Sequence, residues 1–245
     1  MTLLETKGLS RNFGGLQAVD TVDFILPKGE IRAVIGPNGA GKTTFVGMIS
    51  GRITPTNGTI VFKGRDITRR KAWDRVMDGI VYTFQITSVF PNLSCYENIA
   101  LAAQRRLLTG FFGRLTVRED AIAARVDDAL GRVGLAGARE QEAGNLPYGH
   151  QRLLEIAMGL ALEPELLILD EPTQGLSAEE IGGFCDLIRE ISTDTTILLI
   201  EHNMAVVLEL AQRITVMDKG AIIAEGTPAE VEADQDVQRA YLGTA

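Results

Sequence analysis

The feature that most restricts the fold of this chain is a glycine-rich octapeptide that directly follows a short apolar run. It reads Gly-Pro-Asn-Gly-Ala-Gly-Lys-Thr over residues 36–43, and the run before it is Ile31–Ile35. Backbone N–H groups can wrap around phosphate oxygens only where the chain curls tightly, which glycine allows. A helical stretch comes next, and its start would direct positive charge at the anion. The order strand, loop, helix therefore predicts a phosphate-binding loop in an α/β fold.

Each part of this loop has a role in binding a nucleoside triphosphate. Lys42 is expected to neutralise the β and γ phosphates, and the Thr43 hydroxyl can ligate Mg²⁺. The loop residues predicted to bind the nucleotide are Gly36, Pro37, Asn38, Gly39, Ala40, Gly41, Lys42, Thr43 and Thr44. A loop of this kind alone is also compatible with kinases, GTPases and motor proteins.

Two further apolar runs, Leu166–Leu169 and Thr196–Ile200, are typical of buried parallel strands. The first ends in Asp170-Glu171, so two carboxylates lie at the carboxyl end of a strand, where ligands of α/β sheets bind. We expect Asp170 to hold Mg²⁺ through water and Glu171 to accept a proton from an attacking water molecule. Beside a phosphate-binding loop, these carboxylates predict nucleotide hydrolysis rather than a polar turn.

The flanks of the chain carry signals for antiparallel strands. Asn57-Gly58 precedes Thr59–Phe62, and Asp218-Lys219-Gly220 joins Arg213–Met217 to Ala221–Ala224. Both are hairpin signals. Antiparallel strands are therefore expected to accompany the parallel core.

Between residues 86 and 146 the strand pattern is replaced by a helical one. Ser94 and Glu97 fit a capping box, which predicts a helix that begins there and runs through Leu101. A second amphipathic helix is marked by apolar residues at helical spacing, namely Ile122, Val126, Ala129, Leu130 and Val133. We interpret residues 86–146 as a helical subdomain inserted into a core made of residues 1–85 and 147–245.

Composition excludes some classes of function. A formal net charge of −8 and a pI near 4.9 argue against nucleic acid as the partner. The basic cluster Arg65, Arg69, Arg70, Lys71 and Arg75 is interpreted as a solvated face. No apolar run approaches the roughly 18 residues of a membrane span, and no secretory signal pattern begins the chain, so a cytosolic location is expected. The isolated Cys95 and Cys185 are expected to be reduced, packed thiols.

The segment Leu146–Arg152, ahead of Asp170, separates the remaining possibilities. It reads Leu-Pro-Tyr-Gly-His-Gln-Arg and resembles the signature motif of ABC ATPases, which is followed by a helix. Leu153, Ile156, Ala157 and Leu160 would share one face of that helix. In that family the helix start points at the γ-phosphate bound by a partner subunit, so the resemblance implies that Tyr148, Gly149 and His150 bind nucleotide in trans.

Other positions follow the order of that family. Phe13 resembles the aromatic residue that stacks on adenine, with Val19 near the ribose. Gln85 resembles the glutamine that senses Mg²⁺ and the membrane partner, and His202 the switch histidine that contacts the γ-phosphate. The resemblance thus implies an ATPase in which Glu171, His202, Gln85 and Lys42 are catalytic. Thr43, Gln85 and Asp170 are the implied metal ligands.

Within ABC proteins the chain resembles most the ATPase subunits of branched-chain amino acid importers. The segments that carry this similarity are Phe13–Leu16, Glu171–Leu176, Ile200–Met204, the stretch Arg105–Val117 with Phe111-Phe112, Gly226–Pro228 and Ala240–Gly243. Importers of urea, short amides and aromatic acids share these features. Two positions depart from the wider family: Pro147 replaces the signature serine, and Ser177 aligns with the usual aspartate.

The resemblance also implies a fold and partners. The fold would be a P-loop NTPase (RecA-like) core with a mainly parallel sheet, an antiparallel β subdomain and an inserted helical subdomain. The partners would be a second ATPase subunit, identical or homologous, transmembrane permease subunits and a periplasmic solute-binding protein, with no nucleic acid. The ATPase would lie in the cytoplasm, peripherally on the inner face of the plasma membrane. The alternatives are the ATPase of an exporter or lipid-extraction system, and a soluble non-transport ABC ATPase.

Overall fold

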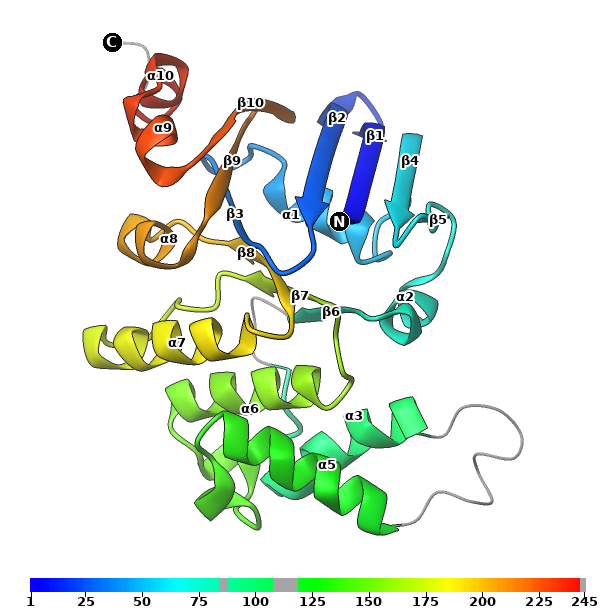
Figure 1. The fold of residues 1–245 in the computed structure, drawn as a ribbon, viewed down its shortest axis with the longest axis vertical. Helices are drawn as coiled ribbons and strands as arrows, with labels where there is room; N and C mark the ends of the chain where they lie inside the picture. The colour runs from blue at the N-terminus through cyan, green and yellow to red at the C-terminus, as the bar shows by residue number, and fades with distance from the viewer. Residues whose placement is uncertain (84–87, 108–118, 243–245) are drawn as a thin grey trace.

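The strands of the protein form two sheets (Figure 1) in a computed structural model that describes residues 1–83, 88–107 and 119–242. The antiparallel sheet has the order β2-β1-β4-β5, with β1 (Thr2–Phe13), β2 (Leu16–Pro27), β4 (Asn57–Phe62) and β5 (Arg65–Asp66). The larger sheet has the order β10-β9-β3-β8-β7-β6, with β3 (Ile31–Ile35), β6 (Ile80–Thr83), β7 (Leu166–Asp170), β8 (Thr196–Ile200), β9 (Arg213–Asp218) and β10 (Ala221–Gly226).

The centre of the larger sheet is parallel and fully buried. Its strands β9, β3, β8, β7 and β6 pair in parallel, while β10 joins as an antiparallel edge strand. Every residue of β3, β7 and β8 is buried, which explains why these strands are continuous apolar runs rather than alternating ones. The three predicted parallel strands and the β9–β10 hairpin are confirmed.

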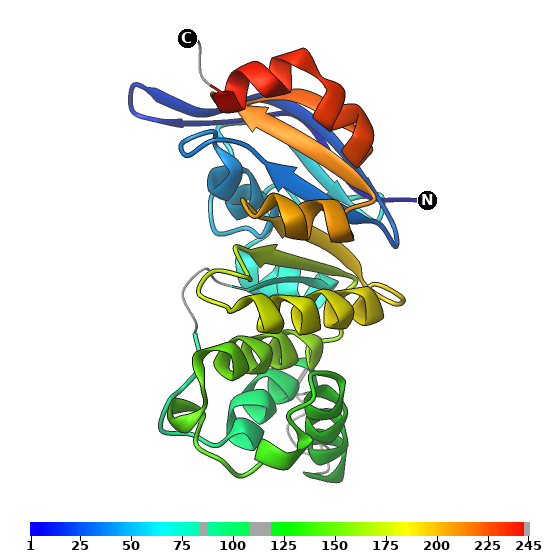
Figure 2. The ribbon, with the colours of Figure 1, turned by 90° about the vertical axis from the view of Figure 1, so that its left-hand side faces the viewer.

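Alternate residues of β7 belong to two different hydrophobic cores. Leu167 and Leu169 of β7 pack with helices on one face. Leu166 and Ile168 pack on the other face, against a cluster that includes Phe24 of β2. The sheet therefore lies between a helical layer and the antiparallel sheet, an arrangement that Figure 2 shows from the side. The predicted α/β class is confirmed.

The helices complete these layers (Figures 1 and 2). They are α1 (Lys42–Ile49), α2 (Ala72–Asp78), α3 (Cys95–Leu107), α5 (Glu119–Arg132), α6 (Tyr148–Leu160), α7 (Ala178–Ile191), α8 (Met204–Leu210), α9 (Pro228–Ala233) and α10 (Gln235–Leu242), with 3-10 turns at Ala136–Ala138 and Ala143–Asn145. None of the helices in the described part of the chain combines the length and apolar character needed to cross a membrane.

Helix α3, in the region predicted to be helical between residues 86 and 146, begins where the local sequence predicts. The Glu97 amide donates to Ser94 Oγ at 3.1 Å, and Glu97 Oε2 accepts from the Ser94 amide at 2.8 Å, so the capping box at the start of α3 is confirmed. Helix α3 runs beyond Leu101 to Leu107. One hydrophobic cluster contains both Ile99 of α3 and Leu167 of β7. Because the core is continuous there, the subdomain boundaries at residues 86 and 146 remain a prediction.

The hairpin predicted from Asn57-Gly58 is wrong. These two residues begin β4, which pairs with the distant β1, and the tight turn lies instead at Lys63-Gly64, between β4 and β5. Both turn residues have positive φ, 52° and 75°, as a two-residue hairpin turn requires. Gly58 has a different reason for being glycine: a Cβ there would lie 2.4 Å from Gly8 O of the paired strand.

The basic cluster is only partly a solvated face. Arg75 is buried, and its guanidinium donates to the carbonyl oxygens of Met48 and Ile49 at 2.6 and 2.8 Å. It therefore ties α2 to the end of α1. Cys95 and Cys185 are buried and unbridged, as predicted.

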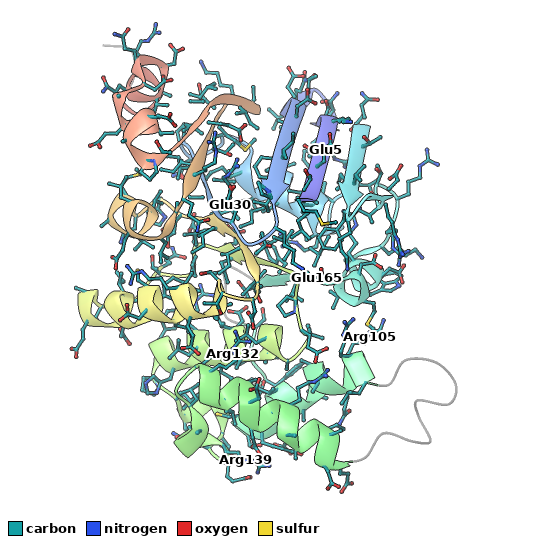
Figure 3. All side chains as sticks on the ribbon, viewed as in Figure 1. Glu5, Glu30, Arg105, Arg132, Arg139 and Glu165 are labelled. Atoms are coloured by element: carbon teal, nitrogen blue, oxygen red, sulfur yellow. The ribbon has the colours of Figure 1, made fainter. Side chains whose placement is uncertain are left out.

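An ion-pair cluster joins the two sheets at the end opposite the predicted site. Glu165, labelled in Figure 3, precedes β7 and pairs with Lys63 of the β4–β5 turn and, at 3.9 Å, with Lys28 after β2. Because all three side chains are partly exposed, the contribution of the cluster to stability is about 1 kcal/mol or less per pair.

Candidate active site

The loops that carry the predicted site residues meet at one edge of the larger sheet. Strands β3, β8 and β7 are neighbours, with Val34 opposite Ile200 and Ile200 opposite Asp170. Because parallel strands end at the same edge, the loops that follow β3, β8 and β7 lie side by side there. This is the edge at which open α/β sheets bind their ligands.

The loop after β3 is shaped by two glycines that approach other backbone closely. Gly36 has φ 151° and Gly41 has φ 98°. A Cβ on Gly36 would lie 2.1 Å from Met217 O, and a Cβ on Gly41 would lie 2.3 Å from Ala18 O. Since neither backbone neighbour is the far end of a flexible side chain, only glycine fits at these positions.

Lys42 is the first residue of α1 and lies across the loop. Its Nζ donates to Gly36 O at 2.7 Å and to Pro37 O at 3.1 Å. Burial lowers the pKa of Lys42, and the nearby carboxylates of Glu171 and Asp170 act in the opposite direction. The structure thus brings the predicted phosphate-binding lysine into the field of both predicted carboxylates.

Asp170, at the end of β7, is buried and hydrogen-bonded. Burial raises its pKa, with the neighbouring charge of Glu171 adding to the rise, while a hydrogen bond from Tyr82 Oη opposes it. Burial and that same bond to Asp170 raise the pKa of Tyr82 above its ordinary range. Tyr82 is covered in turn by Arg52, whose guanidinium carbon lies 3.4 Å from the ring centroid. Neither β6 nor the role of Tyr82 was predicted from the sequence, because a single tyrosine carries no local signal for a contact with a neighbouring strand.

Glu171 and His202 face each other across two adjacent loops. His202 Nδ1 lies 3.8 Å from Glu171 Oε1, and the histidine side chain is 62% exposed. Glu171 has a φ of 48°, and its amide donates to Ile200 O at 2.9 Å. A non-glycine residue in the left-handed region is uncommon and persists where its surroundings fix it. The structure brings these two residues together, and their catalytic roles remain predictions.

The residues near the loop suit Mg²⁺ by their chemistry. Thr43 offers an exposed hydroxyl and Asp170 a carboxylate, both hard oxygen donors of the kind that Mg²⁺ prefers. The part of the chain that the structure describes holds no cluster of three or more His, Cys, Asp or Glu residues arranged for a metal. A donor set with one carboxylate fits Mg²⁺, which usually binds through one or two carboxylates together with phosphate oxygens and water.

The two positions predicted near the base and the ribose differ in exposure. Phe13 is 44% exposed, at the end of β1, and the Arg11 guanidinium carbon lies 4.4 Å from its ring centroid. Val19 is fully buried in the core. The Val19 side chain is not accessible to a ligand in this structure. Its contact with a ribose remains a prediction, and only the β2 backbone could make that contact.

The signature segment begins α6 as predicted. Pro147 is the N-cap residue, and Tyr148 is 45% exposed. Tyr148 packs against the loop after β7, because a Cβ on Gly175 would lie 2.9 Å from its Cε1. Gln85 and Phe111-Phe112 lie outside the described residues.

Comparison with known proteins gives the family. Residues 19–174 match the ABC transporter family, and residues 221–245 match the branched-chain amino acid ATP-binding cassette transporter family. This chain is an ABC transporter ATP-binding subunit. The chain is 40% identical to the high-affinity branched-chain amino acid transport ATP-binding protein LivG of Salmonella typhimurium, over 99% of this chain and 98% of LivG. It is 36% identical to BraF of Pseudomonas aeruginosa, a protein of the same description, with the same coverage.

Solved structures agree with this family and with the fold. An ATP-binding cassette of an ABC transporter superimposes on this one with a TM-score of 0.89 and 28% identity, over 99% of this chain and 100% of the other. An ABC cassette in its ADP conformation gives a TM-score of 0.88 at 28% identity and covers both chains completely. The prediction of an ABC ATPase cassette with an α/β core is therefore confirmed, and the loop after β3 belongs to a nucleotide-binding protein.

Proposed function

We propose that this subunit drives the import of branched-chain amino acids by hydrolysing Mg-ATP as one of two cassettes that close on the nucleotide. The observation that carries the proposal is the meeting of Lys42, Asp170, Glu171 and His202 at adjacent strand ends. The likeness to LivG and BraF over nearly the whole chain, together with the match of residues 221–245, supports branched-chain amino acids as the transported class.

The residues at the strand ends have distinct parts in the proposed reaction. Lys42 binds the β and γ phosphates, and the backbone N–H groups of residues 36–44, Pro37 excepted, surround them. Thr43 and Asp170 would hold Mg²⁺, which supplies charge neutralisation for the phosphates when bound. Glu171 accepts the proton of the attacking water. His202, 3.8 Å from Glu171, contacts the γ-phosphate in this proposal.

The second cassette completes the site in this proposal. Two subunits associate head to tail, and the start of α6 in one directs its free amides at the γ-phosphate held by the other. Tyr148, Gly149 and His150 are the residues at that helix start. Closure excludes water and assembles the groups only when ATP is present. Gln85, the proposed link to the membrane subunits, would report that closure to the permease.

Reconstitution tests the proposal. The subunit would be assembled with its permease subunits in vesicles that contain Mg-ATP, with the solute-binding protein and labelled leucine outside. We expect leucine uptake that stops when Lys42 is replaced by alanine, because the phosphates then lose their cation. ATP-dependent release of solute or lipid from the vesicles would instead identify an exporter. ATP hydrolysis that no permease stimulates would identify a non-transport ATPase.

A further inference from the structure

A buried carboxylate connects the two loops that carry Glu171 and His202. Glu201 follows β8, and its side chain is 0% exposed. It accepts hydrogen bonds from the amides of His202 and Asn203, at 2.8 and 3.0 Å, and from the amide of Thr173 at 3.1 Å. The Thr173 hydroxyl donates a fourth bond. Among the described residues, no lysine or arginine forms an ion pair with Glu201; its polar neighbours are these four donors and the His202 imidazole, whose Nδ1 lies 3.9 Å from Glu201 Oε2.

The four donors come from both sides of the site. Thr173 lies two residues after Glu171 in the loop that follows β7, while His202 and Asn203 belong to the loop that follows β8. Neighbouring strands β7 and β8 (Figure 1) bring these loops together. One side chain therefore joins the two loops from which Glu171 and His202 face each other.

The same carboxylate stabilises the unusual backbone of Glu171. On one side, the Glu171 amide donates to Ile200 O, the residue before Glu201; on the other, Thr173 is bound to Glu201 itself. Between these two anchors Glu171 adopts its φ of 48°. Residues in this region keep their conformation only where neighbouring contacts fix it, and Glu201 supplies the contact on the Thr173 side.

We propose that Glu201 is a positioning residue for ATP hydrolysis, which sets the position of Glu171 relative to His202 by joining their two loops. This inference rests on the proposed role of Glu171 as the base. Glu201 does not touch the nucleotide in this scheme; it acts through Glu171, which faces the attacking water, and His202, which contacts the γ-phosphate.

The hydrogen-bond chemistry explains why a carboxylate is needed here. All four groups hydrogen-bonded to Glu201 are donors, and a carboxylate accepts at both oxygens. A glutamine of nearly the same shape would place an NH₂ group against N–H groups of the backbone, leaving donors unpaired in a buried site. The loops would then move apart by a small distance, and a misplacement of about 1 Å in an active site can lower a rate by about 100-fold.

The test compares Glu201→Gln with wild type in ATPase kinetics and nucleotide binding. We expect kcat to fall by about tenfold to 100-fold, while the Kd of a fluorescent ATP analogue changes by less than about twofold, because Lys42 and the loop amides are unchanged. The Mg-ATP-dependent dimer should also persist longer on gel filtration, since hydrolysis would be slower. Glu225→Gln is the matched control: Glu225 accepts from Arg32 and Thr215, away from the site, and its loss should leave kcat unchanged.

A second pair of variants keeps the proposal testable if Glu201→Gln fails to fold. Thr173→Val removes one donor to Glu201, whereas Thr173→Ser keeps the hydroxyl. We expect kcat to fall in the first variant and to stay near wild type in the second, at equal ATP affinity. Equal kcat values for the valine and serine variants would overturn the proposal, as would a folded Glu201→Gln protein with wild-type kcat. If Glu171→Gln itself retains turnover, the base assignment fails instead, and this is distinguishable from a failure at Glu201 alone.

Discussion

The starts of α1 and α6 present free backbone amides in different surroundings. At α1 the preceding Gly41 is in the left-handed region, and the Gly220 amide holds the loop through Ala40 O at 3.0 Å. Lys42 is the first helical residue and lies near Glu171. The start of α6 has amides but no lysine and no proposed catalytic carboxylate, and like the start of α1 it has no side-chain cap. The start of α1 thus lies beside the groups proposed for hydrolysis, whereas the start of α6 offers backbone donors alone.

The loop after β7 and the start of α7 join these two ends. Tyr148 at the start of α6 packs on Gly175, and a Cβ on Gly149 would lie 2.2 Å from Glu180 Oε1. Glu180 belongs to the capping box of α7 with Ser177. The loop that begins at Glu171 thus ends against α6. The helix start proposed to contact the partner's ATP therefore packs on the loop proposed to act on this chain's own ATP.

The largest expected effect comes from removing the proposed catalytic base, Glu171, which lies near the start of α1 and not at the start of α6. We expect Glu171→Gln to lower turnover by about 10²–10⁴-fold, because the amide keeps the packing and loses proton acceptance. ATP binding should remain, and the closed dimer should accumulate with Mg-ATP, since hydrolysis normally releases it. A phosphate-release assay with gel filtration measures both. Glu179→Gln, an exposed carboxylate in the first turn of α7, is the control, and turnover near wild type in Glu171→Gln would refute the assignment.

The second test concerns Pro147, which has neither a hydroxyl nor an amide proton to offer. In the proposed head-to-tail dimer, the missing hydroxyl and amide proton of Pro147 would affect the ATP held by the partner subunit. A charge-assisted hydrogen bond to the γ-phosphate contributes about 1.5–3 kcal/mol, or roughly tenfold or more in rate. Pro147→Ser should therefore raise the single-turnover rate of the partner's site.

The measurement for Pro147 uses a transporter in which only one site can turn over. With a homologous partner subunit, Glu171→Gln in this chain silences only its own site, so the remaining turnover reports the partner's site. Pro147→Ala supplies the control, because it restores the amide proton without the hydroxyl. If serine gives no more than alanine does, the hydroxyl has no role, and the helix amides alone complete the site.

Phe13 is proposed to stack on the nucleotide base, and its replacement is expected to have a smaller effect than the changes above. One face of its ring is already covered by Arg11 at 4.4 Å, so a base can stack only on the other. From the range of about 1–3 kcal/mol for base–aromatic stacking, we expect the lower end for Phe13→Ala, about fivefold in Kd. ATP and GTP should be affected alike, because stacking reads no base edge.

The alternative for Phe13 is a role in the core, which its 44% exposure disfavours. Loss of a core phenylalanine would lower stability by about 3–5 kcal/mol. A melting scan without nucleotide therefore separates the two. Leu16→Ala, a change at an exposed residue of the same hairpin, is the control. A large fall in melting temperature with unchanged Kd in the folded protein would assign Phe13 to the fold.

The parts of the molecule that sequence could predict are those whose signal is local. The loop at residues 36–43, the buried strands and the capping box at Ser94 each depend on neighbours in sequence. Strands β1 and β2 were not identified, because repeated register shifts in their pairing break the alternation that marks a strand.

The contacts of the site are less predictable because they join distant segments. Tyr82 binds Asp170 across two strands, and Glu201 binds Thr173 across two loops. Gly58 is a further example, because glycine is required there by the close approach of the Gly8 backbone and not by a turn. Sequence indicates which residues carry the chemistry, whereas the residues that position them become visible only in the folded chain.

The smallest expected effect concerns Ser177, the residue that caps α7 beside the start of α6. Its Oγ accepts from the Glu180 amide at 3.3 Å, and its own amide donates to Glu180 Oε2 at 2.8 Å. Ser177→Ala should lower the free energy of unfolding by about 1 kcal/mol, or about 2–4 °C in Tm for a chain of this size. Aspartate caps as well as serine does, so Ser177→Asp should keep the wild-type Tm. If alanine and aspartate both leave Tm unchanged but alter turnover in the dimer, Ser177 acts at the subunit interface rather than as a cap. In that case the starts of α1 and α6 are coupled through the partner subunit and not through the loop after β7.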